Sequence, residues 1–198
     1  KKYLNLTPPM WFIGGTAEDI SKYRRIIKEY VPDLETYEQQ HKIYWWGFLS
    51  DAGISNVLLK CSVLIMHSAF EPGGRVILEA MSSGKPVIAT YSGFGNNYVQ
   101  DWYNGFHVEY GDFQKLSRYL ELFITNPYLS NMLGINSKSL FREINRNWDY
   151  FRRISDLYFG FGTSEYTYKG NLFYKKMQPQ YPNLIDAFPY NDIKNDIS

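Results

Sequence analysis

Apolar and polar positions along the first 110 residues follow two different periods. Short, largely apolar segments at 10–15, 42–48, 62–68, 86–90 and 106–110 predict strands, and the unbroken apolar character of 62–68 indicates burial on both faces. Apolar residues three or four positions apart predict helices at 17–31, 51–61 and 74–83. Strands that alternate with helices through short turns marked by Gly or Pro predict a doubly wound parallel sheet, a Rossmann-like α/β domain.

The C-terminal quarter of the chain has a different pattern. From Phe113 to about residue 159 the apolar spacing stays helical. Residues 160–198 are rich in Tyr, Asn, Pro and Gly and have poor periodicity, although their aromatic residues weigh against full disorder. We therefore expect one domain over 1–159 and an aromatic, polar tail or linker over 160–198.

Composition narrows the class of protein. A chain of 198 residues with 44% hydrophobic residues can bury one sizeable core. A net charge of +1 gives no electrostatic argument for nucleic acid, so we expect no nucleic-acid partner. The longest apolar run, 62–66, is far shorter than the roughly 20 residues of a membrane span.

The single cysteine, Cys61, excludes an internal disulfide framework and suits a reducing compartment, so we expect a cytoplasmic protein. Because Cys61 lies in an apolar run with no obvious base beside it, it is interpreted as a small buried hydrophobe rather than a nucleophile. The N-terminus has no signal-peptide core and does not begin with Met, so we expect a piece of a longer chain.

Candidate chemistry is concentrated in HSAFEPGGRVILEAMSSGKPVIAT, residues 67–90. In a doubly wound sheet ligands bind beyond the carboxyl ends of the strands, where Glu71, Gly73 and Gly74 follow strand 62–68. Glycines allow close approach to backbone N–H groups, and a helix N-terminus suits a diphosphate. Carboxylates at Glu71 and Glu79 can accept hydrogen bonds from vicinal hydroxyls, which predicts a sugar–diphosphate–nucleoside ligand. The alternative is an ordinary turn and helix start, with Glu79 a solvated carboxylate.

The motif resembles the signature of retaining nucleotide-sugar glycosyltransferases of the GT-B fold, in family 4 (glycosyl transferases group 1). Three further segments continue the resemblance in the right order: IYWWGFLSD (43–51), SGFGNNYVQDWYNGFHVEYGD (92–112) and NRNWDYFRRISDLY (145–158). The match covers roughly residues 10–159. It implies that the chain is the C-terminal, donor-binding half of a GT-B fold. The first strand and helix of that half, with an Arg–Lys pair for the diphosphate, and the acceptor-binding N-terminal domain would be missing.

The resemblance also implies residue roles. Glu79 would accept from ribose hydroxyls, and Glu71, the catalytic carboxylate, from hydroxyls of the donor sugar. The sugar and diphosphate would be faced by the helix start, at Gly73, Gly74, Arg75, Val76 and Ile77. The base would lie near Phe48 and Leu49. Two assignments stay open: Arg75 either pairs with phosphate or lies on the helix surface, and His67 either touches the ligand or has a hydrogen-bonded structural role.

Four positions depart from the pattern of that family. His67 stands where Pro is usual, and Gly73 replaces Phe. Phe94 lies in a turn that is usually Gly-Gly, and Trp102 replaces the Gly of an Asp-Gly turn.

The same resemblance implies metal-independent transfer of the sugar with retention at the anomeric carbon. It also implies that the isolated chain would not catalyse this transfer alone. The sequence has no Asp-x-Asp, and His41, His67 and His107 are scattered, so we expect no metal. The substrate would be a nucleotide sugar such as a UDP- or GDP-sugar, and the acceptor a glycan or a lipid-linked glycan.

Basic residues near the C-terminal helices allow peripheral membrane contact, although most such faces are merely solvated. They are Lys138, Arg142, Arg146, Arg152 and Arg153. The alternative functions are a non-catalytic nucleotide- or sugar-binding module and a nucleotide-sugar epimerase or phosphorylase on the same fold.

Overall fold

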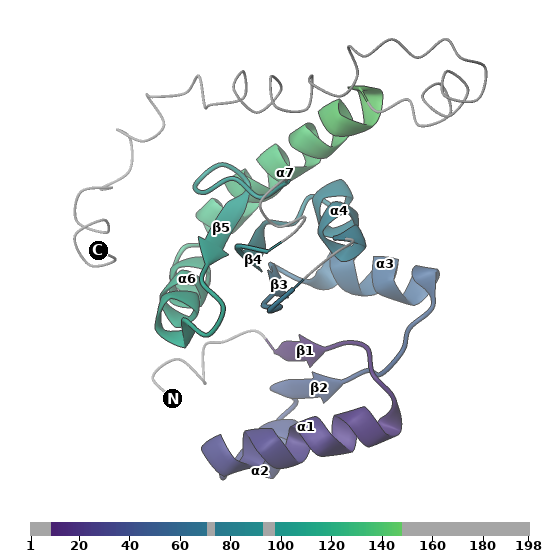
Figure 1. Cartoon of the computed structure of the whole chain (residues 1–198), viewed down its shortest axis with the longest axis vertical. Helices are drawn as coiled ribbons and strands as arrows, with labels where there is room; N and C mark the ends of the chain where they lie inside the picture. Colours follow the sequence, from purple (N-terminus) through teal and green to yellow (C-terminus); the bar gives the residue numbers. More distant parts are fainter. Residues whose placement is uncertain (1–8, 71–73, 93–97, 148–198) are drawn as a thin grey trace.

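The computed structural model of the chain describes residues 9–70, 74–92 and 98–147 (Figure 1). The strands are β1 (Met10–Phe12), β2 (Ile43–Trp45), β3 (Leu64–Met66), β4 (Val87–Thr90) and β5 (Gly105–Val108). The helices are α1 (Ala17–Tyr30), α2 (Leu34–Gln39), α3 (Asp51–Lys60), α4 (Arg75–Ser82), α6 (Phe113–Thr125) and α7 (Pro127–Asn147).

All strand pairing in the described residues is parallel, as the sequence predicts, but the strands form two hydrogen-bonded sheets rather than one. β1 pairs with β2, in the register Met10 with Ile43, and the second sheet has the order β3-β4-β5. Within the described residues, β1 and β3 are not hydrogen-bonded to each other.

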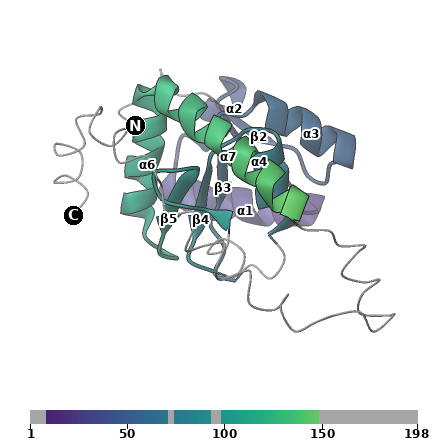
Figure 2. The same cartoon turned by 90° about the horizontal axis from the view of Figure 1, so that it is seen from above.

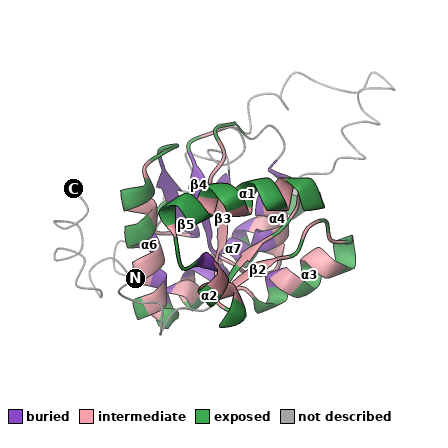
Figure 3. Cartoon of the chain, turned by 90° about the horizontal axis from the view of Figure 1, so that it is seen from below, coloured by how far each residue is buried: buried purple, intermediate pink, exposed green. Residues whose placement is uncertain are grey.

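The core lies on both faces of the β3-β4-β5 sheet. Every residue of β4 and β5 is buried, and α1 is largely exposed (Figure 3). Val87 and Ala89 point to one face, into a cluster with residues of α3, α4 and α7, while Ile88 points to the other, with residues of α6 and α7. Alternation along a strand therefore places helices on both faces of the sheet (Figure 2), which confirms the doubly wound α/β class.

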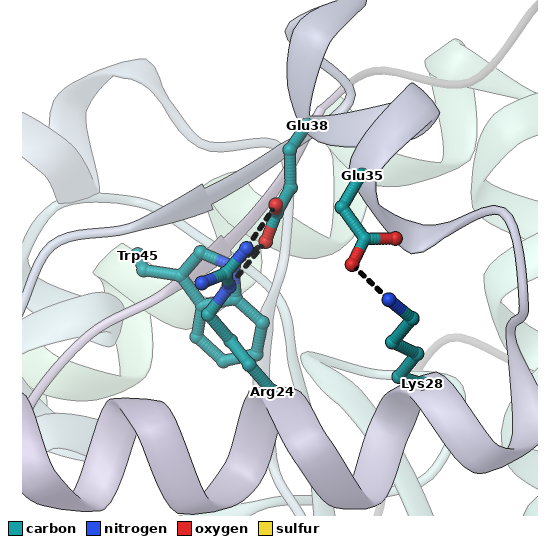
Figure 4. Close-up of polar contacts among 5 residues, drawn as sticks. All are labelled: Arg24, Lys28, Glu35, Glu38 and Trp45. Atoms are coloured by element: carbon teal, nitrogen blue, oxygen red, sulfur yellow. Dashed lines mark hydrogen bonds and ion pairs between the residues drawn. The ribbon is translucent and has the colours of Figure 1, made fainter.

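The β1-β2 sheet is held to its helices by polar contacts more than by burial. Thr16 and Asp19 form a capping box at the start of α1, which has no fully buried residue. The Glu38 carboxylate of α2 accepts hydrogen bonds from Arg24 of α1, at 2.6 and 2.7 Å, and from the Trp45 ring N–H, at 2.7 Å (Figure 4). The short helix α2 is not predicted by the sequence pattern.

The helical region after Phe113 consists of two helices. Asn126 ends α6, and its side-chain oxygen accepts from the Leu129 N–H at 3.2 Å, while Pro127 opens α7. Proline suits the first position of a helix because its missing N–H has no intrahelical partner there. The helix expected between 148 and 159, and the tail 160–198, lie outside the described residues.

Two further expectations can be compared with the structure. Cys61 is half-buried after α3, and burial raises the pKa of its thiol, which suits an apolar role better than a nucleophilic one. Among the described helices, none combines the length and the apolar character needed to cross a bilayer.

Candidate functional site

The start of α4 has the backbone geometry that its sequence motif requires. Gly74, the N-cap residue, is buried and has φ 51° and ψ 16°, a left-handed conformation that glycine adopts without strain. No side chain in the described part of the chain caps this helix end. Glu71 and Gly73, which precede it, lie outside the described residues.

Glu79 lies one turn along α4 and is paired. Its Oε1 accepts a hydrogen bond from Arg75 Nε at 2.6 Å, and Arg75 Nη2 also donates to Asp51 Oδ1 at 3.2 Å. The Glu79 side chain is 31% exposed, so the carboxylate can be reached from solvent. Its carboxylate thus points back toward the start of α4, where the sequence motif predicts the ligand.

The three predicted site residues of the first helical turn differ in burial. The Ile77 side chain is fully buried in the core, and its N–H donates to the Gly74 carbonyl at 2.9 Å. Val76 is half-buried and Arg75 is exposed. Arg75 and Val76 therefore lie nearer to solvent than Ile77, which supports the helix start from the core side.

The predicted base end is linked to α4. Phe48 is 77% exposed and Leu49 is half-buried, just before α3. Ser50 caps α3 by accepting from the Gly53 N–H at 3.2 Å, and Asp51 is the first helical residue. Because Asp51 pairs with Arg75, the structure brings the base-end segment and the start of α4 together. Asp51 is not among the predicted site residues, and no spacing signal connects it to a position 24 residues away.

Side-chain contacts hold the carboxyl ends of β3, β4 and β5 together. His67, after β3, accepts from the Gly111 N–H through Nε2 at 3.3 Å and stacks on Tyr110 at 5.3 Å. The Thr90 hydroxyl at the end of β4 donates to the Ser68 carbonyl at 2.6 Å. His67 therefore makes the hydrogen-bonded structural contact that was one of its two interpretations, at the edge where ligands bind in such sheets.

A polar cluster between β4 and β5 is another feature that sequence reasoning missed. Tyr91 stacks on His107 at 4.6 Å, and Asp101 accepts from the His107 backbone N–H at 2.6 Å. Burial, with the nearby Asp101 carboxylate, raises the pKa of the Tyr91 hydroxyl. Each of these contacts links residues from separate segments, so spacing in the sequence gave no signal of it.

Trp102 has φ 64°, in the left-handed region, at the position where the resembled pattern has glycine. A bulky residue is strained there. Its ring packs edge-on against Phe106 at 4.9 Å, which offsets part of that strain. The turn therefore keeps its shape without the usual glycine. Phe94, another departure, lies outside the described residues.

In the residues that the structure covers, no three His, Cys, Asp or Glu side chains gather as metal ligands would. The described groups near the start of α4 include backbone N–H groups, the Arg75 guanidinium and the carboxylates of Glu79 and Asp51. Such groups can bind hydroxyls and an anion at a helix end.

Comparison with known proteins identifies the family. The sequence model described as "Glycosyl transferases group 1" matches residues 28–140, more than half of the chain. The chain belongs to this family. The matched residues include α4 with Glu79, the whole β3-β4-β5 sheet and α6.

Individual relatives of this group 1 glycosyltransferase chain are longer. A sucrose synthase from Acidithiobacillus caldus is 28% identical over 160 residues, which cover 74% of this chain and 20% of that protein. Sucrose-phosphate synthase from Thermosynechococcus elongatus superposes with a TM-score of 0.64 and 23% identity, covering 76% and 38% of the two chains. HepE from Anabaena, solved with UDP-glucose, gives a TM-score of 0.56 and 25% identity, covering 71% and 38%.

The fold of the chain is accordingly that of the GT-B glycosyltransferases, of which it forms an α/β part. The chain spans about a fifth of the sucrose synthase and less than half of the two solved structures.

Proposed function

We propose that this chain is the donor-binding part of a retaining glycosyltransferase. It binds a nucleotide-diphosphate sugar at the start of α4, without a metal ion, for transfer to a glycan or a lipid-linked glycan. The acceptor is bound by a separate domain. The observation that carries the proposal is the position of Glu79, whose carboxylate points toward a helix N-terminus that begins at a left-handed glycine.

The chemistry of this helix end supports a sugar nucleotide. The positive end of the helix dipole and the N–H groups of the first turn favour the diphosphate. The partly exposed Glu79 carboxylate accepts hydrogen bonds from the ribose hydroxyls. Glu71, immediately before the helix, binds hydroxyls of the sugar that is transferred, and Phe48 and Leu49 lie toward the base. The solved HepE complex with UDP-glucose supports the same class of ligand.

Transfer needs the diphosphate to leave with its charge stabilised. In this proposal the α4 N-terminus stabilises the developing charge at fixed positions, which is the electrostatic task that a divalent cation has in other enzymes. The same face of the donor receives the acceptor, so the anomeric configuration is retained. Lys138 and Arg142, both exposed on α7, provide a basic face for peripheral contact with an anionic membrane.

Calorimetry tests the donor site directly. The chain is titrated with UDP, GDP, UDP-glucose and a GDP-hexose, and compared with Glu79→Ala and Glu71→Ala. We expect Glu79→Ala to weaken every nucleotide at least tenfold, because a charge-assisted hydrogen bond is lost from the ribose. Glu71→Ala should weaken only the sugar nucleotides. Glu29→Ala, an exposed glutamate on α1, is the matched control and should change nothing.

Two results would overturn the proposal. One is a folded chain that binds none of the four nucleotides, which favours a different kind of binding module. The other is a nucleotide affinity that stays unchanged in Glu79→Ala, because this would show that Glu79 does not contact the ribose. Retention is tested on the longer protein that carries this domain, by NMR of the anomeric proton of the first product formed; inversion contradicts the mechanism.

A further inference from the structure

The surroundings of Arg75 do not suit a residue that binds phosphate. Its guanidinium lies between two carboxylates, with Nε 2.6 Å from Glu79 Oε1 and Nη2 3.2 Å from Asp51 Oδ1. One positive group facing two negative groups gives this cluster a net negative charge, which repels a diphosphate rather than attracting it.

The Arg75–Glu79 pair is also poorly explained by helix stability. Arg75 is the first residue of α4, where a positive charge faces the positive end of the helix dipole. An acid that follows a base at i,i+4 is the less favourable order for such a pair. Because both effects oppose the helix, they point to a role of Arg75 in the site itself.

We propose that Arg75 is a positioning residue that holds the Glu79 carboxylate in the orientation that selects ribose over 2′-deoxyribose. This inference rests on the proposed function, because it assumes that Glu79 meets the ribose. In the described residues, Arg75 is the one side chain bonded to that carboxylate, through Oε1. The second oxygen, Oε2, has no hydrogen bond within the described residues and can accept one from a hydroxyl. A glutamate side chain without this bond has several rotamers and loses conformational freedom on binding.

Asp51 extends the arrangement to the base end of the site. It begins α3, directly after the segment of Phe48 and Leu49, and it contacts the guanidinium that holds Glu79. The Asp51 side chain is 92% exposed, so its salt bridge contributes little by itself. We therefore expect loss of Asp51 to have a smaller effect than loss of Arg75.

The experiment compares a ribonucleotide with its 2′-deoxy analogue by calorimetry on the 198-residue chain. UDP and 2′-deoxy-UDP are used, or GDP and 2′-deoxy-GDP if the chain binds GDP more tightly. We expect the unmodified chain to prefer the ribonucleotide roughly tenfold, as for one charge-assisted hydrogen bond. Arg75→Met and Glu79→Gln should each bring that preference close to one, and the double variant should do no more. Asp51→Asn should reduce it only partly.

The 2′-deoxy analogue separates positioning from phosphate binding. If Arg75 positions Glu79, Arg75→Met lowers the affinity for the ribonucleotide more than the affinity for the deoxynucleotide, so the preference for ribose falls. If Arg75 binds the diphosphate, both affinities fall by the same factor and the inference is wrong. Arg25→Met, an exposed arginine on α1, is the matched control. Thermal unfolding of Arg75→Met should stay at or slightly above the midpoint of the unmodified chain, since Arg75 is 76% exposed and its charge opposes the helix dipole.

The remaining outcomes distinguish this inference from the proposed function. A preference for ribose that disappears in Glu79→Gln but survives in Arg75→Met overturns only the positioning role. Tight nucleotide binding with no preference for ribose overturns the contact between Glu79 and the ribose, and with it this inference. No binding by a folded chain overturns the proposed function as a whole.

Discussion

Gly134 of α7 lies directly against Gly84, which follows the C-cap residue of α4: a Cβ placed on Gly134 would stand 2.2 Å from the Gly84 carbonyl oxygen. Backbone contact this close requires glycine at position 134. It fixes the helix that carries Glu79 against the longest helix of the domain.

Gly134→Ala tests this contact by the sign of its effect. In the interior of a free helix this change stabilises by about 1 kcal/mol. Here the new methyl group meets backbone atoms of Gly84, so we expect the free energy of unfolding to fall by about 2–3 kcal/mol, which is the usual effect of overpacking. Urea unfolding measures it. Ser139→Ala, at an exposed position on the same helix, should leave stability unchanged or slightly raised. A stabilised Gly134→Ala variant would show that the two helices are not in contact there.

Asn104 organises the turn that leads into β5. Its side chain is fully buried, with Nδ2 donating to the Tyr98 carbonyl at 2.9 Å and Oδ1 accepting from the Gln100 N–H at 2.7 Å. We expect Asn104→Ala to lower the free energy of unfolding by about 2–4 kcal/mol, because the Tyr98 carbonyl and the Gln100 N–H both lose their hydrogen-bond partner. Asn136→Ala, which removes one half-buried hydrogen bond to the Tyr103 carbonyl, should cost less in the same unfolding experiment. Equal losses would contradict this account.

The elements that the sequence predicted best are those with the strongest local signals. β4 is a continuous apolar run that begins after Pro86, and α4 ends just before the left-handed Gly84, so both boundaries are local. Burial of β4 on both faces follows from the same pattern. These signals also placed Glu79 on the right helix.

The missed features depend on contacts between distant parts of the chain. The short helix α2 buries a single residue, Leu34, and is held by Glu38 through Arg24 and Trp45. The pairing of Arg75 with Asp51 joins flexible, exposed side chains, whose direction no sequence period specifies. The split of the strands into two sheets depends on which strands are neighbours in space, and a list of strands does not contain that information.

Glu38 makes stability depend on pH. Its hydrogen bond with Arg24, together with the Trp45 N–H, holds the pKa of the Glu38 carboxyl below its usual range. A lowered folded-state pKa stabilises the protein above the unfolded-state value of about 4.3, and this contribution is lost as the pH falls through the folded-state pKa. We expect Glu38→Gln to lower the free energy of unfolding by about 1–2 kcal/mol at neutral pH. This is the usual contribution of a hydrogen bond between charged groups, reduced because Arg24 is half-exposed to solvent.

The difference in unfolding free energy between Glu38→Gln and the unmodified chain should become smaller in acid, because Glu38 of the unmodified chain is then itself protonated. Urea unfolding from neutral pH down to the lowest pH at which the chain stays folded measures it. Glu35→Gln removes the partner of Lys28 on the exposed side of the same pair of helices and should have a smaller effect at every pH (Figure 4). A difference that grows in acid would reverse the sign of this argument.

Gly74 connects the fold to the proposed function most directly. Because its φ is 51°, a side chain at this position is strained, and we expect Gly74→Ala to cost about 1–2 kcal/mol in unfolding free energy. Asn tolerates the left-handed conformation better than Ala, so Gly74→Asn should unfold closer to the unmodified chain. Both variants add atoms where the diphosphate is proposed to approach, so both should weaken UDP or GDP by a similar factor in calorimetry. Gly84→Ala, at a left-handed glycine beyond the other end of α4, is the matched control, and it should lose stability but keep full nucleotide affinity. Full nucleotide affinity in a folded Gly74→Asn variant would mean that the ligand does not approach the backbone at the start of α4.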